Sequence, residues 1–158
     1  MDAVPLRRPL PRLALAGLVV VAVTTSCVHP AGTARNLADY ESKAKNTAES
    51  VLSAVETAGI AVDAGTRDRA FPAFVTVVVG EAESDATAAV SGFEAIQPPN
   101  ATSDRLRDQL GELTDQATDI LADTRIAARR AETSDLLAQT QPLQQTAEGL
   151  RSFIAEHS

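Results

Sequence analysis

Apolar residues recur every three or four positions along most of the chain after residue 33, which is the spacing of one face of an α-helix. Four segments carry this pattern, at roughly 34–63, 71–96, 103–131 and 135–156. Each segment predicts one helix with an apolar stripe. In chain order the stripes are Leu37, Tyr40, Ala44, Ala48, Val51, Val55, Ala58 and Val62; Phe71, Val75, Val78, Ala82, Ala86, Ala89, Phe93 and Ile96; Leu106, Leu110, Leu113, Ala117, Ile120, Thr124, Ala127 and Ala131; and Leu136, Thr140, Leu143, Ala147, Leu150 and Ile154.

The breaks between the first three segments have recognisable causes. Gly65 and the polar stretch 66–69 interrupt the first stripe, and the two prolines within 97–100 cannot continue the second. Pro142 lies inside the fourth segment, where we expect it to kink the helix or leave one carbonyl unpaired.

The third and fourth segments are separated by a step of five residues, which predicts a tight turn at 132–134. Thr102 or Ser103 is expected to cap the start of the third helix. Thr133 or Ser134 is expected to cap the fourth.

The stretch Phe74–Val79 is rich in β-branched residues, which suit a buried strand. The sequence offers no second strand to pair with it, and an isolated strand leaves its backbone groups unsatisfied. The helical stripe also continues through the stretch, so we expect a helix. Short connections favour antiparallel neighbours. The predicted fold is therefore all-α, an antiparallel up-down four-helix bundle whose small alanines allow a tight core.

The N-terminal segment has the layout of a bacterial secretory signal peptide. Arg7, Arg8 and Arg12 precede the uncharged apolar run Leu13–Val23, which is too short to span a bilayer as a helix. Small residues then lead to Cys27, the only cysteine of the chain. Acylation of its thiol explains an unpaired cysteine in a secreted chain.

This interpretation divides the chain into a cleavable lipoprotein signal peptide (1–26), a lipidated tether (27–33) and the helical domain (34–158). It places the domain at the extracytoplasmic face of the cell membrane, anchored through acylated Cys27. Two or more acyl chains anchor a protein stably, whereas one binds only marginally.

Alternatives to the lipoprotein interpretation stay open. Thr24 stands where a lipoprotein signal prefers an aliphatic residue, so the cleavage motif is degenerate. An ordinary signal peptide, or an uncleaved anchor with an incidental cysteine, accounts for the same segment. The Arg7–Arg8 pair suggests twin-arginine export, although Pro9 and Pro11 fit that motif poorly.

Charge excludes some classes of partner. The chain has 14 Lys+Arg and 21 Asp+Glu. Three of the arginines and Asp2 belong to the leader, so the part that remains after cleavage has 11 basic and 20 acidic residues and a net charge of −9. Binding to nucleic acid or to anionic lipid head groups requires clustered cations. We therefore expect neither. Aromatic-lined ligand pockets are also disfavoured, because the chain has no Trp and one Tyr.

Catalytic and metal sites are not expected either. A di-metal centre in a helical bundle needs inward Glu-x-x-His motifs, and the only histidines are His29 in the tether and His157 near the end. Hydrolase chemistry needs a nucleophile with a base such as histidine. We expect no enzyme activity and no cofactor.

Charged residues of the third segment are the candidates for an interaction surface. An acidic row lies away from the apolar stripe and suits a cation or a basic partner, and a basic group near the segment's end suits an anion or an acidic partner. A solvated face and compensation of the helix dipole are the plainer explanations. The row is Asp108, Glu112, Asp115, Asp119 and Asp123, and the group is Arg125, Arg129 and Arg130, with Arg67 and Arg69 as further candidates.

The leader, the alanine-rich helices and three short stretches resemble uncharacterised actinobacterial secreted lipoproteins with an alanine-rich helical domain. The stretches are Phe71–Phe74, Ile96–Pro99 and Arg125–Arg130. The resemblance implies an envelope location and a helical fold, and it implies no activity.

The leading hypothesis is a non-enzymatic, membrane-anchored module of the cell envelope that binds another envelope protein or has a structural role. A contiguous apolar patch on the second helix would support it. The alternative is a carrier or sensor of a small hydrophobic ligand. An enclosed apolar cavity would favour the carrier, and a dry alanine-packed core would count against it.

The anchor is testable in cells. Cys27→Ala is expected to move the protein from the membrane fraction to the soluble fraction, because the variant lacks the acyl acceptor. Immunoblots of the two fractions measure the shift. Persistence of the variant in the membrane fraction would contradict acyl anchoring.

Overall fold

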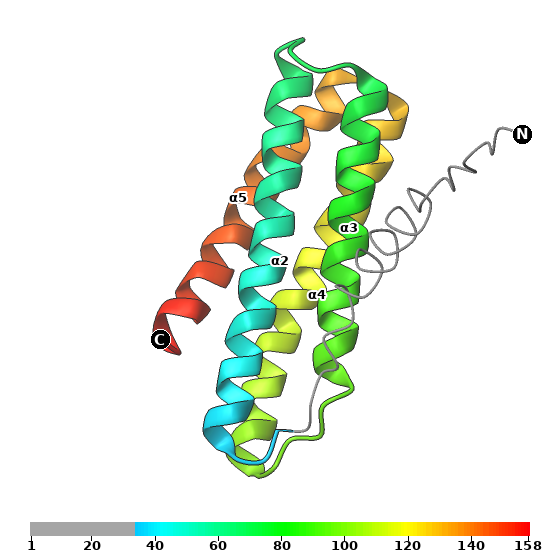
Figure 1. The fold of residues 1–158 in the computed structure, drawn as a ribbon. Coiled ribbons are helices and arrows are strands. Elements are labelled where there is room, and N and C mark those ends of the chain that lie inside the picture. The colour runs from blue at the N-terminus through cyan, green and yellow to red at the C-terminus, as the bar shows by residue number, and fades with distance from the viewer. Residues whose placement is uncertain (1–33) are drawn as a thin grey trace, which may run out of the picture. The chain divides into compact units, whose positions relative to one another are not determined.

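The computed structural model describes residues 34–158. The expected signal peptide, Cys27 and the tether lie outside the described residues. The described part contains four helices, which run alternately up and down and are joined by short connections (Figure 1). The predicted all-α up-down bundle is therefore confirmed. The helices are α2 (Leu37–Thr66), α3 (Pro72–Glu94), α4 (Ala101–Arg130) and α5 (Thr133–Glu156).

The helix ends show where the sequence interpretation was wrong. Asn100 caps α4, since its Oδ1 accepts from the backbone N–H groups of Thr102 at 3.0 Å and Ser103 at 3.1 Å. The expected caps, Thr102 and Ser103, are instead recipients of that cap and already lie within the helix. Asn36 caps α2 in the same way, through a 2.9 Å bond from the backbone N–H of Asp39.

The turn between α4 and α5 is shorter than expected. Ala131 adopts a left-handed backbone conformation with φ 56°, and α5 then begins at Thr133 after Glu132. Neither Thr133 nor Ser134 caps α5, because both already belong to its first turn. The residue that precedes the helix, Glu132, makes no side-chain cap bond.

The stretch Phe74–Val79 is helical, as predicted, and lies within the first turns of α3. Pro72 is the first helical residue, a position at which its missing N–H costs no hydrogen bond. Phe71 precedes the helix in an extended conformation and is 83% exposed, so its assignment to the buried stripe was wrong. Pro142 lies inside α5, which continues past it.

The core confirms most of the predicted stripes. The stripe of α2 is buried from Tyr40 to Val62. In α4 the buried set is wider than one stripe, because Thr114 and Leu121 are buried in addition to Leu110 and Ala117. Several residues of the predicted stripes are not fully buried. In α4, Leu113 and Ile120 pack only partly against the core, and Ala131 is exposed. In the other helices the partly buried stripe residues are Leu37, Val78, Ala89 and Ile154. Thr140 of α5 is also exposed.

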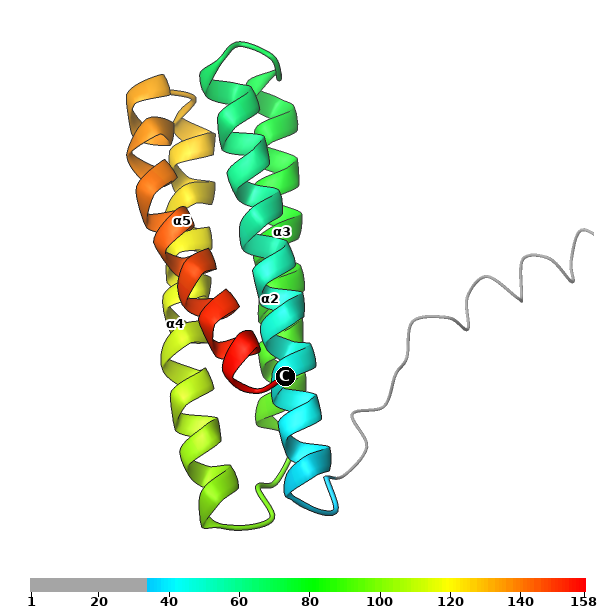
Figure 2. The same ribbon diagram turned by 90° about the vertical axis from the view of Figure 1, so that its left-hand side faces the viewer.

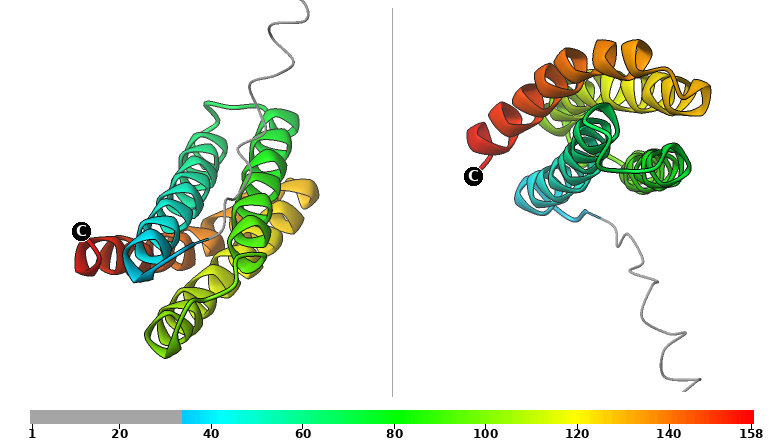
Figure 3. Two further views of the ribbon diagram at one scale, coloured as in Figure 1. Left: turned by 60° about the horizontal axis from the view of Figure 1, so that its bottom comes forward. Right: turned by 90° about the horizontal axis from the view of Figure 1, so that it is seen from above.

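The bundle is not square in cross-section. α2 and α4 each contact the other three helices, whereas α3 and α5 share no contact within residues 34–158. The views in Figures 2 and 3 agree, because α3 and α5 lie on opposite flanks of the α2–α4 pair. Small side chains allow α2 and α4 to approach across what would be a diagonal. The buried small residues are Ala44, Ala48, Ala54, Ala58 and Ala61 on α2 and Ser103, Thr114, Ala117, Thr124, Ala127 and Ala128 on α4.

The buried threonines of α4 satisfy their hydroxyls within their own helix. Thr114 Oγ1 donates to the carbonyl oxygen of Leu110 at 3.0 Å, and Thr124 Oγ1 donates to that of Ile120 at 2.6 Å. Their burial therefore leaves no polar group unpaired. None of the helices within residues 34–158 combines the length and the apolar character that crossing a bilayer requires.

The strained turn at Ala131 generates a stability prediction. Ala131→Gly is expected to raise the free energy of unfolding by about 1 kcal/mol, because glycine adopts the left-handed conformation without the Cβ penalty. Chemical denaturation monitored by circular dichroism measures the change.

Ala138→Gly is the matched control for this substitution. Ala138 is exposed within α5, so glycine there is expected to lower the free energy of unfolding by about 1 kcal/mol. Destabilisation by Ala131→Gly would contradict the expectation.

Candidate functional site

The acidic row of α4 is exposed along its whole length, and its first three members line a surface groove. We name this the α3/α4 groove. It has a volume of about 540 Å³. Asp119 and Asp123 lie further along α4 and do not line it. The lining residues are Asp108, Gly111, Glu112, Thr114, Asp115 and Arg107 of α4, Val90, Phe93 and Glu94 of α3, and Thr47 of α2.

Apolar and acidic groups share the α3/α4 groove. Val90 and Phe93 contribute apolar surface from the end of α3, and Phe93 is itself buried. Four carboxylates line the groove, and none of them forms an ion pair with another described residue. They are Glu94, Asp108, Glu112 and Asp115.

Arg107 is the only basic residue that lines this groove, and it ties α4 to the end of α3. Its Nη2 donates to the backbone oxygen of Glu94 at 2.6 Å. A cation at this position is favourable, because the last carbonyls of α3 carry the negative end of the helix dipole. With one cation against four carboxylates, the groove has a formal net charge of −3.

Tyr40 packs directly behind this groove. Its ring lies 5.1 Å from that of Phe93, centroid to centroid, and the side chain is fully buried. Within residues 34–158 its hydroxyl is the one buried side-chain polar atom that has no hydrogen-bond partner. Burial raises the pKa of the Tyr40 phenol; the charge of Arg107 opposes this shift, and those of Asp104 and Asp108 add to it.

The predicted basic group is largely neutralised by carboxylates. Arg125 forms a hydrogen-bonded ion pair with Glu83 of α3, which raises the pKa of the guanidinium. Arg130 lies 3.5 Å from a carboxylate oxygen of Asp135, and Arg129 is exposed.

Arg67 and Arg69, the further candidates for the basic group, both bind Asp63 instead of joining it. The Nη2 of Arg67 lies 2.7 Å from the carboxylate. Because these cations have partners within the chain, the structure does not assemble them into one free anion-binding patch.

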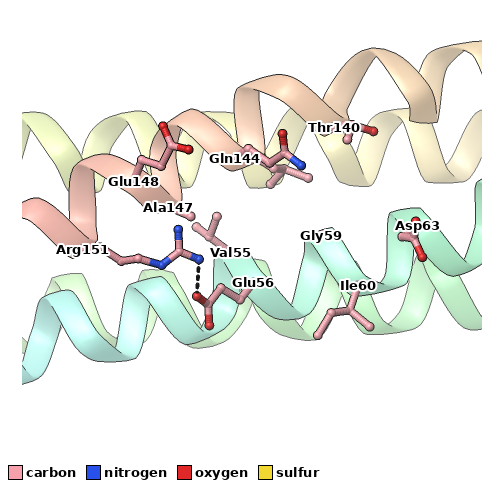
Figure 4. A pocket seen from close by; sticks show the side chains of 11 residues that line it. Val55, Glu56, Gly59, Ile60, Asp63, Thr140, Gln144, Ala147, Glu148 and Arg151 are labelled. Carbon is pink, nitrogen blue, oxygen red and sulfur yellow. Dashed lines mark hydrogen bonds and ion pairs between the residues drawn. The ribbon is translucent and has the colours of Figure 1, made fainter.

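A second groove, with a volume of about 740 Å³, is lined by residues of α2 and α5 (Figure 4). Val55 and Ala147 lie between the two helices, and the Arg151 guanidinium bridges to Glu56 at 2.6 Å. Asp63 and Glu148 also line it. The groove is thus edged by charges on both helices.

The start of α3 carries an exposed apolar row whose residues the sequence interpretation did not identify. Phe71, Phe74 and Val77 are 83%, 58% and 62% exposed. Their spacing of three residues places Phe74 and Val77 next to each other on one helix face. This spacing is visible in the sequence. However, the apolar residues of the buried stripe, beginning with Val75, lie in the same stretch, so the two sets could not be told apart.

Potential metal ligands are scattered in the described part of the chain. No three His, Cys, Asp or Glu side chains within it are grouped as metal ligands. His157 lies at the end of α5, where its Nδ1 is 2.8 Å from the backbone oxygen of Phe153. His29 lies outside the described residues.

Comparisons with protein-family models, with curated proteins and with solved structures found no match to this chain.

The buried phenol generates the prediction for this site. Tyr40→Phe is expected to leave the free energy of unfolding at pH 7 unchanged or raised by about 1 kcal/mol, because the hydroxyl is desolvated without a partner. A loss of more than about 1 kcal/mol would show that the hydroxyl is bonded to a polar group.

The same substitution has a signature at alkaline pH. The pKa of Tyr40 is raised above its ordinary value of 10.0 in the folded state. Its contribution to stability is therefore complete below the unfolded pKa and is lost as the pH rises towards the folded pKa. Wild type is expected to lose more stability than Tyr40→Phe above pH 10, as measured by urea denaturation across that range.

Proposed function

We propose that this chain is a lipid-anchored module of the cell envelope, held at the extracytoplasmic face by acylated Cys27, that binds another envelope protein without catalysing a reaction. The observation that carries the proposal is the exposed apolar row at the start of α3, which consists of Phe71, Phe74 and Val77.

The row is an energetic argument for a partner. Burial of a large apolar side chain stabilises an interface by about 1.5–3 kcal/mol, and aromatic residues are enriched at the energetic centres of such interfaces. Phe71 and Phe74 are the only phenylalanines that are exposed within residues 34–158, since Phe93 and Phe153 are buried. Single exposed apolar residues need no explanation, but two aromatic residues and a valine close together on one element do.

The position of the row fits an anchored protein. The described chain enters α2 at Leu37, and Phe71 follows the opposite end of the same helix (Figure 1). α2 has 30 residues, which corresponds to a rod of about 45 Å at 1.5 Å per residue. Cys27 precedes the start of α2 in the chain, whereas the apolar row follows the other end of α2.

The alternative, a carrier of a small hydrophobic ligand, gains no support from the two grooves. Both have charged side chains in their linings, whereas apolar ligands bind in enclosed and mostly apolar cavities.

In-cell crosslinking in the native host tests the proposed role. Affinity purification and mass spectrometry of the tagged full-length protein are expected to recover a dominant partner. Phe74→Asp is expected to reduce its recovery by about tenfold, because a charge would then have to be buried at the contact. Cys27→Ala is expected to reduce it too, by removing the protein from the membrane.

Ile60→Asp is the matched control for Phe74→Asp. Ile60 is 72% exposed on α2 and lines the groove shared with α5, so the same kind of change is made outside the apolar row. The control is expected to recover the partner at the wild-type level. Equal recovery with Phe74→Asp, or co-purification of a small apolar molecule in place of a protein, would contradict the proposal.

A further inference from the structure

We propose that the α3/α4 groove binds lysine or arginine side chains carried on a cationic segment of a partner protein. The inference rests on the proposed role as a protein-binding module, but it concerns a different surface. The groove lies at the end of α3, around Val90 to Glu94, whereas the exposed apolar row lies at its start.

The acidic charge of the groove is complementary to a cationic partner. The groove carries four carboxylates that form no ion pair with other described residues, against the single cation Arg107. Glu56, Asp63, Glu83 and Asp135 are paired with arginines of the chain, whereas other exposed acids such as Asp119 and Asp123 form no ion pair with described residues either. The groove differs from these single acids because it gathers four such carboxylates around one hollow.

The mixed lining of the groove suits one kind of cation. No three carboxylates within residues 34–158 converge as ligands of a metal ion. The apolar surface of Val90 and Phe93 next to these carboxylates gives a mixed lining. Lysine and arginine match such a lining, because their methylene stems pack on apolar surface while the charged head reaches a polar partner.

The α3/α4 groove has open space at Gly111 and walls that are held in place. A Cβ built at Gly111 would meet no heavy atom within 4 Å, so the middle of the groove is open at the helix backbone. Arg107 holds the end of α3 against α4 through its bond to Glu94, and the Tyr40 ring supports Phe93 from behind. The acidic and apolar walls are thus positioned before any partner arrives, which lowers the cost of ordering on binding.

A peptide titration tests the groove. The full-length protein, purified in a mild non-ionic detergent, is titrated into a short fluorescein-labelled peptide of lysine and leucine with helical amphipathic spacing, and anisotropy reports binding. A peptide with glutamate in place of lysine is expected not to bind. Binding is expected to weaken as salt rises, because ion pairs at an exposed groove are screened.

Two variants test whether the peptide binds in the groove. Gly111→Leu fills the open position, and Glu112→Lys reverses one unpaired charge; each is expected to raise Kd by about tenfold. Their matched controls are Gly80→Leu and Asp119→Lys. Gly80 is equally open but lies on α3 outside the groove, and Asp119 is an exposed member of the same acidic row that does not line it. Both controls are expected to stay within about twofold of wild type.

Tyrosine emission provides a second measurement on the same titration. Tyr40 is the only tyrosine of a chain without tryptophan, and its ring packs in a tilted arrangement against that of the groove residue Phe93. Addition of the unlabelled lysine–leucine peptide is expected to change its emission at similar peptide concentrations in wild type and Asp119→Lys, and only at about tenfold higher concentration in Gly111→Leu.

Two results would overturn the proposal. One is an equal loss of affinity in Glu112→Lys and Asp119→Lys, which would show that overall acidity and not the groove attracts the peptide. The other is no binding by wild type at low salt. Neither result bears on the exposed apolar row, which the in-cell capture with Phe74→Asp tests separately.

Discussion

The close approach of α2 and α4 is the constraint on which the rest of the structure depends. α2 buries five alanines, α4 buries alanine, serine and threonine, and the two helices contact each other across the bundle. When one diagonal pair of a four-helix bundle closes, the other pair is held apart. α3 and α5 are therefore flanking helices, each packed on the central pair and not on each other. The two surface grooves lie along these flanks, one beside α3 and one beside α5.

The charged residues at the two ends of the bundle differ in whether they have partners within the chain. Of the arginines at the end of the bundle that carries the α2–α3 connection, Arg67, Arg69 and Arg125 are held by carboxylates of the chain. The acids of the α3/α4 groove have no such partners among the described residues. A net charge of −9 for the chain after Cys27 strengthens the negative field around that groove and would increase the rate at which cationic partners arrive.

Helical periodicity was sufficient to predict four helices, their order and most of the core, because a stripe of apolar residues constrains a helix locally. It was insufficient for α4, where Thr114 and Leu121 are buried because this helix is covered by three others and buries more than a single stripe. Phe71 fitted the spacing but precedes Pro72, so its extended backbone takes the ring out of the core. The exposure of the acidic row could be predicted, whereas the groove could not, since it requires Glu94 and Arg107 to meet across two helices.

The position of α2, which contacts both α3 and α5, also determines how the bundle can open. Because α3 and α5 do not touch, either flank can separate locally from the central pair while the other stays in place. The amide hydrogens of α2, which is covered on three sides, then exchange with solvent only in the largest openings. Partial unfolding is thus divided into two independent events, and a partner bound on the α3 flank would suppress one of them without slowing the other.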